Sequence, residues 1–491
     1  MAGMGFEPRS YMDIPEERRP SLGQALVPVI GMIVFLTVGA IGFGLDPHMP
    51  LLWGCVLTGI VGRYWLNYTW DDLFSGISNG ISMGIQALLI LFIIYMLIPV
   101  WIGSGTIPGL IYYGLALLTP EIFLPAAALI ATASAFSIGS SWTTAATLGV
   151  ALMGIGQGLG VPAPMTAGAV LTGAYTGDKI TPLSDTTNLA AAVTNTDLME
   201  HVNTMRVGTG LALAIALVIY AGLGLRISGD IPAGQVETIQ TGILAGYEIT
   251  PLVFVPLIAT FGLALIGYPA LPTLVGGVFA GVATMLLVQG TGFAEAWQIA
   301  QAGTAPATGT ELVDDLLASD GLDGSAWTIS IVVVALSLGG LLEKTGTLAA
   351  LANGIEGLIS SVGGLTISTG VTAFAMNGLA GQQYMSIVIP SMTFRGVYEE
   401  FNLESKNLSR AVEAAGTTTS VLIPWNAGGA FMTATLGVSP LAYGPYYLLG
   451  FLSPAILFVM GLTGWRITYR DDETPEEGGS PPPKQAPADG D

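Results

Sequence analysis

The chain has 491 residues, of which 52% are hydrophobic and only 10% are charged, and its mean hydropathy is +0.67. These values exclude an ordinary soluble domain and indicate a polytopic membrane protein. The formal net charge is -20, because 34 Asp and Glu stand against 14 Lys and Arg. Such an acid-rich surface stays hydrated in concentrated salt, so we expect a halophilic source.

The apolar runs fall into two sets of five predicted spans. They lie near residues 26–45, 50–66, 81–102, 162–200 and 205–225, and near residues 251–267, 270–289, 326–343, 405–437 and 441–462. Polar residues interrupt the fourth run of each set, as expected for a broken helix. Before that run, each set has a short amphipathic piece (105–118 and 346–361) and two apolar half-lengths joined by a polar tip. We predict an interfacial helix and a re-entrant hairpin at each place.

The two sets resemble each other along the chain. Gly105 and Gly346 lie in similar short motifs 241 residues apart, and Asn188 and Asn426 lie 238 residues apart. Because five spans are an odd number, the second copy must enter the membrane upside down. The expected fold is therefore an all-α polytopic protein built from two inverted-topology repeats of five spans. The predicted divisions are an N-terminal segment (1–25), repeat 1 (26–225), an external linker (226–250), repeat 2 (251–465) and a disordered acidic tail (466–491).

The positions of the charged residues predict the orientation of the chain. If the N-terminus is inside, almost all Lys and Arg fall on the cytoplasmic side, where short loops collect them. The loop 304–325, predicted to be external, has five acidic residues and no basic one. We therefore expect a multi-pass protein of the cell membrane with both termini in the cytoplasm. Its expected surroundings are the lipid bilayer and no nucleic acid, and a homodimer is one candidate assembly.

The segment Gly173–Asn188, with the sequence G-A-Y-T-G-D-K-I-T-P-L-S-D-T-T-N, places ionisable groups within an apolar run. Such groups cost roughly 2.5–3.5 kcal/mol each at membrane depth, so they persist mainly where they have a function or a partner. Glycine and proline weaken the helix here and free backbone carbonyls. We predict a site for Na⁺ and protons around Asp178 and Asp185. The neighbouring predicted ligands are Ser184, Thr186, Thr187 and Asn188.

Lys179 is interpreted as a counter-charge that replaces the ion in the empty state. The alternative is a lysine that extends to the nearer membrane interface. The hairpin tips offer hydroxyl and amide oxygens, and the predicted tip residues are Ser140, Ser141, Thr143 and Asn377. Here the alternative is that the hydroxyls bond to carbonyls of their own helices.

The second break, G-T-T-T-S-V-L-I-P-W-N, has no carboxylate of its own. Asn426 closes it and Glu413 lies three residues before it, and both are predicted to bind the ion or the proton. For Glu413 the competing interpretation is an intrahelical ion pair with Arg410 at i−3. His201 follows Glu200 at a predicted loop end on the cytoplasmic side, where a histidine is a candidate pH sensor.

Three stretches resemble the NhaC-type sodium/proton antiporter family, within a larger superfamily of inverted-repeat carriers. They are M-G-I-G-Q-G-L-G-V-P-A-P (Met153–Pro164), G-A-Y-T-G-D-K-I-T-P-L-S-D-T-T-N-L-A (Gly173–Ala190) and P-W-N (Pro424–Asn426). The resemblance covers roughly residues 25 to 465. It implies Na⁺/H⁺ exchange, with two broken helices and two hairpins around the site. The chain departs from the expected pattern at Ala414, where an acid is expected, and at Ala427 and Gly428, where a hydroxyl and a thiol are expected.

The sequence thus predicts a secondary active transporter that exchanges Na⁺ for H⁺ by alternating access. Apart from the transported ions, no cofactor is expected. The alternative within transport is an exchanger of carboxylates or amino acids coupled to Na⁺ or H⁺. An enzyme is disfavoured, because the sequence contains neither a nucleophile and base set nor a metal-ligand set.

Overall fold

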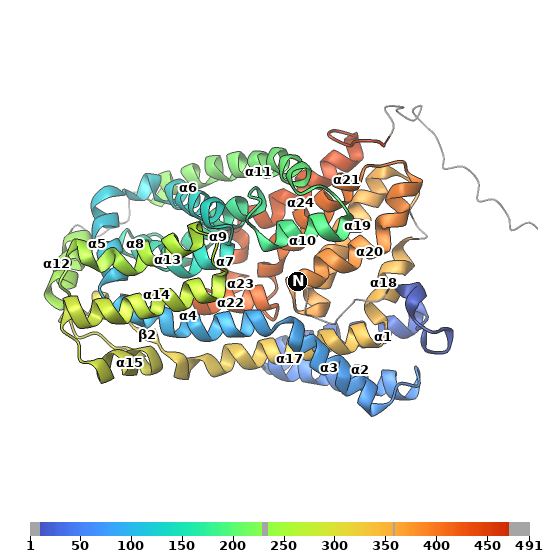
Figure 1. The fold of residues 1–491 in the computed structure, drawn as a ribbon, viewed down its shortest axis with the longest axis horizontal. Coiled ribbons are helices and arrows are strands. Elements are labelled where there is room, and N and C mark those ends of the chain that lie inside the picture. The colour runs from blue at the N-terminus through green and yellow to red at the C-terminus, as the bar shows by residue number, and fades with distance from the viewer. Residues whose placement is uncertain (1–9, 228–233, 357–358, 471–491) are drawn as a thin grey trace, which may run out of the picture.

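The computed structural model describes residues 10–227, 234–356 and 359–470 (Figure 1). Apart from one pair of two-residue strands, the described elements are helices. The first half of the chain contains α1 (Leu22–Thr37), α2 (His48–Tyr64), α3 (Trp70–Met83), α4 (Ile85–Gly103), α5 (Thr106–Leu117), α6 (Pro120–Ile138), α7 (Ser141–Thr144), α8 (Val150–Gly158), α9 (Ala163–Lys179), α10 (Asp185–Thr194), α11 (Leu198–Ile227) and α12 (Gln235–Gly246).

The second half continues with η5 (Pro251–Phe254), α13 (Val255–Leu265), α14 (Ala270–Thr284), α15 (Phe293–Ala302), β1 (Gly303–Thr304), α16 (Glu311–Leu316), β2 (Ser319–Asp320), α17 (Ala326–Lys344), α18 (Thr347–Glu356), α19 (Val362–Ala380), α20 (Gln383–Glu400), α21 (Ser405–Val412), α22 (Ala427–Leu436), α23 (Pro440–Tyr443) and α24 (Leu448–Thr463). Strands β1 and β2 pair antiparallel. Single π-helical turns extend four of the helices: η3 (Val38–Gly42), η4 (Ala145–Gly149), η6 (Met285–Gln289) and η8 (Glu413–Thr417).

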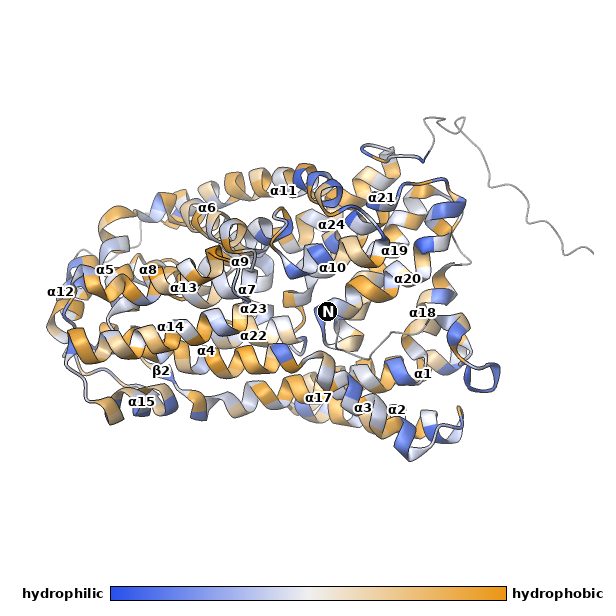
Figure 2. Cartoon of the chain, in the orientation of Figure 1, coloured by the Kyte–Doolittle hydropathy of each residue, from blue (hydrophilic) through white to orange (hydrophobic). Residues whose placement is uncertain are grey.

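The helices are long and apolar enough for a multi-pass membrane protein. Among the described residues, six helices pass the length and hydropathy test for a membrane span, and two bent helix pairs raise the number to as many as eight. Hydrophobic residues run along the helices of the body, and hydrophilic ones gather toward its two ends (Figure 2). The expectation of an all-helical polytopic protein is confirmed at this level. Five inverted spans per repeat remain a prediction.

Both predicted breaks are present, and the chain turns at both places where a hairpin is predicted, while the re-entrant character of the hairpins stays a prediction. Helices α9 and α10 are separated by residues 180–184, and α21 with η8 is separated from α22 by a stretch that includes residues 423–426. The first hairpin turns at Gly139 between α6 and α7, and the second turns at Gly381 between α19 and α20. Their φ angles are 75° and 64°, in the left-handed region that favours glycine. In Figure 1 the α7 tip, α9, α10 and α22 lie in the middle of the body.

The sequence landmarks recur as matched backbone features. Gly105 and Gly346 both have a positive φ, and each precedes a short helix, α5 or α18. The range 226–250, predicted as a linker, contains α12, although residues 228–233 lie outside the described chain. Of the predicted tail, residues 466–470 bond to α20 and α21, for example through Arg470 and Glu399 at 3.0 Å. Residues 471–491 lie outside the described chain.

Glycines allow close contact within two helix pairs, α9 with α6 and α3 with α17. In α9, a Cβ added at Gly173 would lie 2.1 Å from the Ala128 carbonyl oxygen of α6, and one added at Gly177 would lie 2.2 Å from the Thr132 oxygen. In α3, a Cβ at Gly80 would lie 2.2 Å from the Leu336 oxygen of α17. Small residues at such spacings are typical of helix contacts in membranes. They fix α9, which carries Asp178, directly against α6.

The N-terminus of α3 is held by a capping box. The Thr69 hydroxyl accepts from the Asp72 N–H at 3.1 Å, and the Asp72 carboxylate accepts from the Thr69 N–H at 3.1 Å. The Asp72 carboxylate also accepts from the Thr69 hydroxyl at 2.9 Å. The hydrogen bonds from the Thr69 N–H and hydroxyl are the main reason that the pKa of Asp72 lies below its usual value, and Arg18 and Lys344 add to the effect. Because Arg18 bonds to the same carboxylate at 3.3 Å, the cap also links the N-terminal segment to α3.

Replacing Thr69 by alanine is expected to lower the free energy of unfolding by about 1 kcal/mol, because it removes the side-chain cap. Exchange activity is expected to stay unchanged. A matched control is Thr310→Ala, since Thr310 stands at the N-cap of α16 without a side-chain cap bond. Thermal unfolding of the detergent-solubilised variants measures the difference. Equal unfolding temperatures for the two variants would show that the cap contributes no stability.

Candidate transport site

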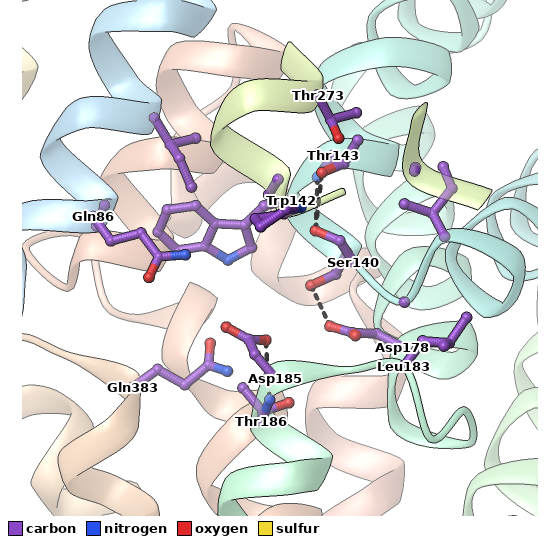
Figure 3. A pocket seen from close by; sticks show the side chains of 18 of the residues that line it. Gln86, Ser140, Trp142, Thr143, Asp178, Leu183, Asp185, Thr186, Thr273 and Gln383 are labelled. Carbon is purple, nitrogen blue, oxygen red and sulfur yellow. Dashed lines mark hydrogen bonds between the residues drawn. The ribbon is translucent and has the colours of Figure 1, made fainter. Parts of the chain in front are cut away.

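The two hairpin tips and the two breaks surround one cavity of about 350 Å³ (Figure 3). It is lined by residues of both halves of the chain. They include Gln86, Ser140, Ser141, Trp142, Thr143, Asp178, Leu183, Asp185, Thr186, Tyr268, Thr273, Gln382, Gln383, Tyr384, Ala427 and Gly428. Among the described residues of the lining, the charged ones are Asp178 and Asp185, and there is no Lys, Arg or His. The cavity therefore presents negative charge in an otherwise neutral wall.

Asp178 lies at the end of α9 and is buried. Its Oδ2 accepts from the Ser141 hydroxyl at 2.7 Å, which joins the first break to the first hairpin tip. Its Oδ1 is buried without a hydrogen-bond partner among the described protein atoms. A buried carboxylate oxygen without a donor is costly, so this oxygen is available to a bound cation or proton.

Asp185 is the first residue of α10 and is exposed at the opposite side of the break. Its Oδ1 accepts from the Thr186 N–H at 2.9 Å, and its Oδ2 accepts from the Tyr384 hydroxyl at 2.5 Å. The second bond joins the first break to the second hairpin. Figure 3 shows Asp178 and Asp185 in the same cavity wall. The structure thus brings together the two carboxylates that the sequence singled out.

The first hairpin tip contributes hydroxyls and an aromatic ring. Ser140 caps α7 by accepting from the Thr143 N–H at 3.1 Å, and both side chains line the cavity. Trp142 stacks on Phe431 of α22, with ring centroids 4.2 Å apart and planes at 19°. The ring is therefore fixed between the first tip and the second broken helix.

The other predicted ligands lie behind the cavity wall and hold the breaks together. Ser184 caps α10, and Asn188 donates to the Pro182 carbonyl at 2.8 Å. Asn426 accepts from the Gly428 N–H at 2.9 Å and donates to the Asn377 carbonyl at the same distance. Asn377 in turn donates to the Gly416 carbonyl at 2.7 Å. Their role in binding stays a prediction, while these hydrogen bonds hold the two breaks and the second tip in place.

Glu413 also lies outside the lining, and it has partners that the sequence does not show. Its carboxylate contacts Nε2 of His201 and accepts from the Thr187 hydroxyl at 3.0 Å. Arg410, the competing partner, instead donates to the Arg466 carbonyl at 2.9 Å. Lys179 is buried and donates to the Ser453 hydroxyl at 2.8 Å. It therefore does not extend to an interface in this conformation.

Several lining residues are absent from the sequence-based site. Trp142 stands within the predicted tip, but an aromatic residue in an apolar hairpin gives no sign of facing a cavity. Gln86 lies in α4, whose sequence predicts an ordinary apolar span. Tyr384 directly follows the Gln382-Gln383 pair, and that position is the one signal that points to it. Among the described residues, no group of three or more His, Cys, Asp and Glu could hold a metal ion.

Comparison with known proteins places the chain among antiporters. The family model described as the Na⁺/H⁺ antiporter family matches residues 24–187 and 173–465. The chain is 53% identical over 476 residues to the arginine/ornithine antiporter ArcD of Halobacterium salinarum, a match that covers 96% of this chain and 98% of that protein.

Two further relatives are named for other transport activities. The chain is 34% identical to the Na⁺/H⁺ antiporter NhaC of Alkalihalophilus pseudofirmus, over 91% of this chain and 97% of that protein. It is 33% identical to the malate-2H⁺/Na⁺-lactate antiporter of Bacillus subtilis, over 93% and 98%. These relatives are transporters and not enzymes, and the resemblance predicted from the glycine-rich and acidic motifs is confirmed. The chain belongs to the Na⁺/H⁺ antiporter family.

Proposed function

We propose that this protein exchanges cationic amino acids, of the arginine and ornithine kind, across the cell membrane by alternating access. The observation that carries the proposal is the cavity, whose described lining has two carboxylates and no basic side chain. A volume of about 350 Å³ falls within the range of small-molecule sites, which begins at roughly 300 Å³. A single dehydrated ion does not require such a space.

The charges of the cavity suit the two ends of a cationic amino acid. The guanidinium or ammonium group would lie near Asp178 and Asp185, where charge-assisted hydrogen bonds are strongest. The α-carboxylate would lie near the N-termini of α20 and α22, whose first residues line the cavity. Helix N-termini favour negative groups through their free N–H groups and their dipole.

The departures from the family pattern support an organic substrate. Ala427 and Gly428 stand where a hydroxyl and a thiol are expected, and both line the cavity. Smaller side chains there leave more room and remove oxygen and sulfur ligands. The relative with 53% identity is an arginine/ornithine antiporter, which agrees with this interpretation. An exchanger of dicarboxylates is disfavoured, because the two lining carboxylates would repel its substrate.

Exchange of Na⁺ for H⁺ is the second candidate. It is supported by the family match, by two Na⁺/H⁺ antiporters at 33 to 34% identity, and by the free Oδ1 of Asp178 beside hydroxyl oxygens. In this case Na⁺ and a proton would compete for the carboxylates, as the sequence predicted. Either function places the protein in the membrane. Cytoplasmic termini remain part of the proposal.

The two functions are separated by reconstitution into liposomes loaded with ornithine. Uptake of labelled arginine is expected, and liposomes without internal ornithine serve as the control. A parallel arm applies a Na⁺ gradient and follows a pH-sensitive dye. If arginine uptake fails with ornithine inside and the Na⁺ gradient changes the internal pH, Na⁺/H⁺ exchange replaces amino-acid exchange as the function.

Replacing Trp142 by leucine is expected to weaken arginine binding about tenfold, because a desolvated cation–π contact contributes roughly 1–2 kcal/mol. Na⁺-driven proton movement, if present, should change little. A suitable control is Trp53→Leu, since Trp53 packs edge-on against Phe35 in α1, away from the lining. The half-saturating arginine concentration of exchange is the quantity to measure. An unchanged value would show that the ring does not face the substrate.

A further inference from the structure

A second group of buried ionisable side chains lies behind the cavity wall, at the junction of α9, α11, α21 and η8. It consists of Lys179, His201 and Glu413, all 0% exposed. None of the three lines the cavity. The cavity and the amino-acid exchange proposed above make no use of these groups. Buried charges are costly unless they are paired, and at membrane depth they usually have a function.

The hydrogen bonds around His201 fix where its protons lie. The Ser409 hydroxyl donates to the Lys406 carbonyl at 3.1 Å, so it accepts from Nδ1 of His201, 2.8 Å away. Nδ1 therefore carries a hydrogen. On the other side, Nε2 contacts the Glu413 carboxylate, which as an anion only accepts. The contact requires one hydrogen, either on Nε2 or on the carboxyl group. The pair thus holds one proton more than a neutral imidazole and a carboxylate.

Two chains of contacts join this pair to Asp178 and Lys179. The Thr187 hydroxyl donates to Oε1 of Glu413 at 3.0 Å and lies 3.4 Å from the Asp178 carbonyl oxygen. The Lys179 ammonium donates to Ser453, and Ser453 donates to the Ala414 carbonyl at 2.8 Å, next to Glu413. The turn that presents Asp178 to the cavity is therefore bonded to the turn that carries Glu413.

Lys179 is the buried charge that the contacts described above link to both the pair and the turn of Asp178, so a change of charge at Asp178 acts on the pair through it. Helices α19 and α24, which pack against η8, contain no titratable residue. The titratable residues on the other elements around the pair are Tyr175, Asp178 and Lys179 of α9, Asp185 of α10, Glu200, Arg206, Tyr220 and Arg226 of α11, Tyr384, Arg395, Tyr398, Glu399 and Glu400 of α20, and Lys406 and Arg410 of α21.

We propose that the His201–Glu413 pair is a proton-binding site separate from the substrate cavity, coupled through Thr187 and Lys179 to cation binding at Asp178. A cation at Asp178 neutralises the charge that balances Lys179, so the positive charge of Lys179 then acts on the pair and favours release of its proton. By linkage, protonation of the pair weakens cation binding to the same extent. The coupling rests on the proposed function, whereas the proton site itself does not.

The test uses the fact that the chain has two histidines, His48 and His201. In a full-length His48→Gln protein labelled with ¹⁵N-histidine and placed in lipid nanodiscs, His201 gives the remaining imidazole signals. These signals are followed from about pH 5 to 10 without substrate, the range around the titration of histidine. The same titration is made with Glu413→Gln added and, as a control, with Glu200→Gln added. Glu200 pairs with Lys406 at the surface.

One pH-dependent change of the His201 ¹⁵N signals is expected, and its midpoint should move to lower pH by about one unit or more in Glu413→Gln, because that variant lacks one of the two groups that hold the proton between them. Glu200→Gln should leave it in place. Imidazole ¹⁵N signals that do not change between pH 5 and 10, or that change equally with and without Glu413, would overturn the proton site. If Glu413→Gln does not fold, Glu413→Asp is used, which withdraws the carboxylate by one methylene.

The coupling is tested by repeating the titration with arginine or with NaCl present. The cation that the cavity binds should move the midpoint to lower pH, and the pH dependence of exchange should be lost in His201→Gln but kept in His48→Gln. A midpoint unmoved by a cation whose binding is shown by equilibrium dialysis would overturn the coupling. If neither cation binds, the proposed function fails, while the titration without substrate still decides the proton site.

Discussion

Exchange is expected to fall at least about thirtyfold when Asp178 is replaced by asparagine. The side chain is buried and its Oδ1 has no partner among the described protein atoms, so its charge is directed at whatever enters the cavity. Removing one partner of a buried, hydrogen-bonded charge pair costs roughly 2–5 kcal/mol. The amide also offers N–H donors to a cation, which adds repulsion. The hydrogen bond from Ser141 can survive the change, so the fold should persist.

Asp185→Asn is expected to have a smaller effect, on the order of tenfold, because Asp185 is exposed and its carboxylate already accepts from Tyr384 and Thr186. The control is Asp71→Asn, an exposed acid in the first turn of α3. Rates of exchange in liposomes at matched protein amounts give the comparison, and elution as a single species in gel filtration reports the fold. Exchange within threefold of the wild type in Asp178→Asn would remove this carboxylate from the substrate site.

Replacing Gly173 by alanine should prevent α9 from packing on α6. The added Cβ would lie 2.1 Å from a backbone oxygen of Ala128, which cannot rotate away as a side chain can. Overpacking of this kind costs roughly 1–3 kcal/mol, and more where both contacts are helix backbones. We expect a lower yield of folded protein and a lower unfolding temperature. Asp178, five residues further along α9, would move with the helix.

The matched control is Gly210→Ala in α11, because nothing lies within 4 Å of a Cβ built at Gly210. That change should leave the stability unchanged or raise it slightly, since alanine favours the helix by roughly 0.5–1 kcal/mol. Unfolding temperatures in detergent and the amount of monodisperse protein provide the comparison. A Gly173→Ala protein as stable as Gly210→Ala would mean that the two helices can separate without loss.

Local chemistry in the sequence predicts much of the site. The polar run with Pro182 indicates the first break, and the structure has it at residues 180–184. The predicted tip residue Ser140 directly follows the turn at Gly139, and the predicted tip residue Asn377 lies four residues before the turn at Gly381. These features depend on residues close together in the chain, such as glycine at a positive φ and hydroxyls at helix caps. Sequence patterns therefore predict such local features well.

Contacts between distant residues are not predictable in this way. His201 and Glu413 are 212 residues apart, so a histidine at a predicted loop end gave no sign of a buried acidic partner. The spacing of Arg410 and Glu413 favoured an ion pair that the structure does not show, because the Arg410 guanidinium turns to the backbone near Arg466. Helix α12 was also missed, since its buried face, with Ile239 and Ile243, is short and lies between polar residues.

The described lining has no basic side chain, and this affects how fast the carrier can reorient without bound substrate. When Asp178 and Asp185 are both ionised, an unoccupied cavity carries two uncompensated negative charges, and in the proposed exchange an organic cation compensates one of them. Carrying an uncompensated charge through the apolar middle of a membrane protein costs several kcal/mol. A difference of about 4 kcal/mol slows reorientation of the unloaded carrier roughly a thousandfold. Under the proposed function, the carrier reorients quickly only after it binds a second cation from the opposite side, so net one-way transport is expected to be slow and one-for-one exchange fast.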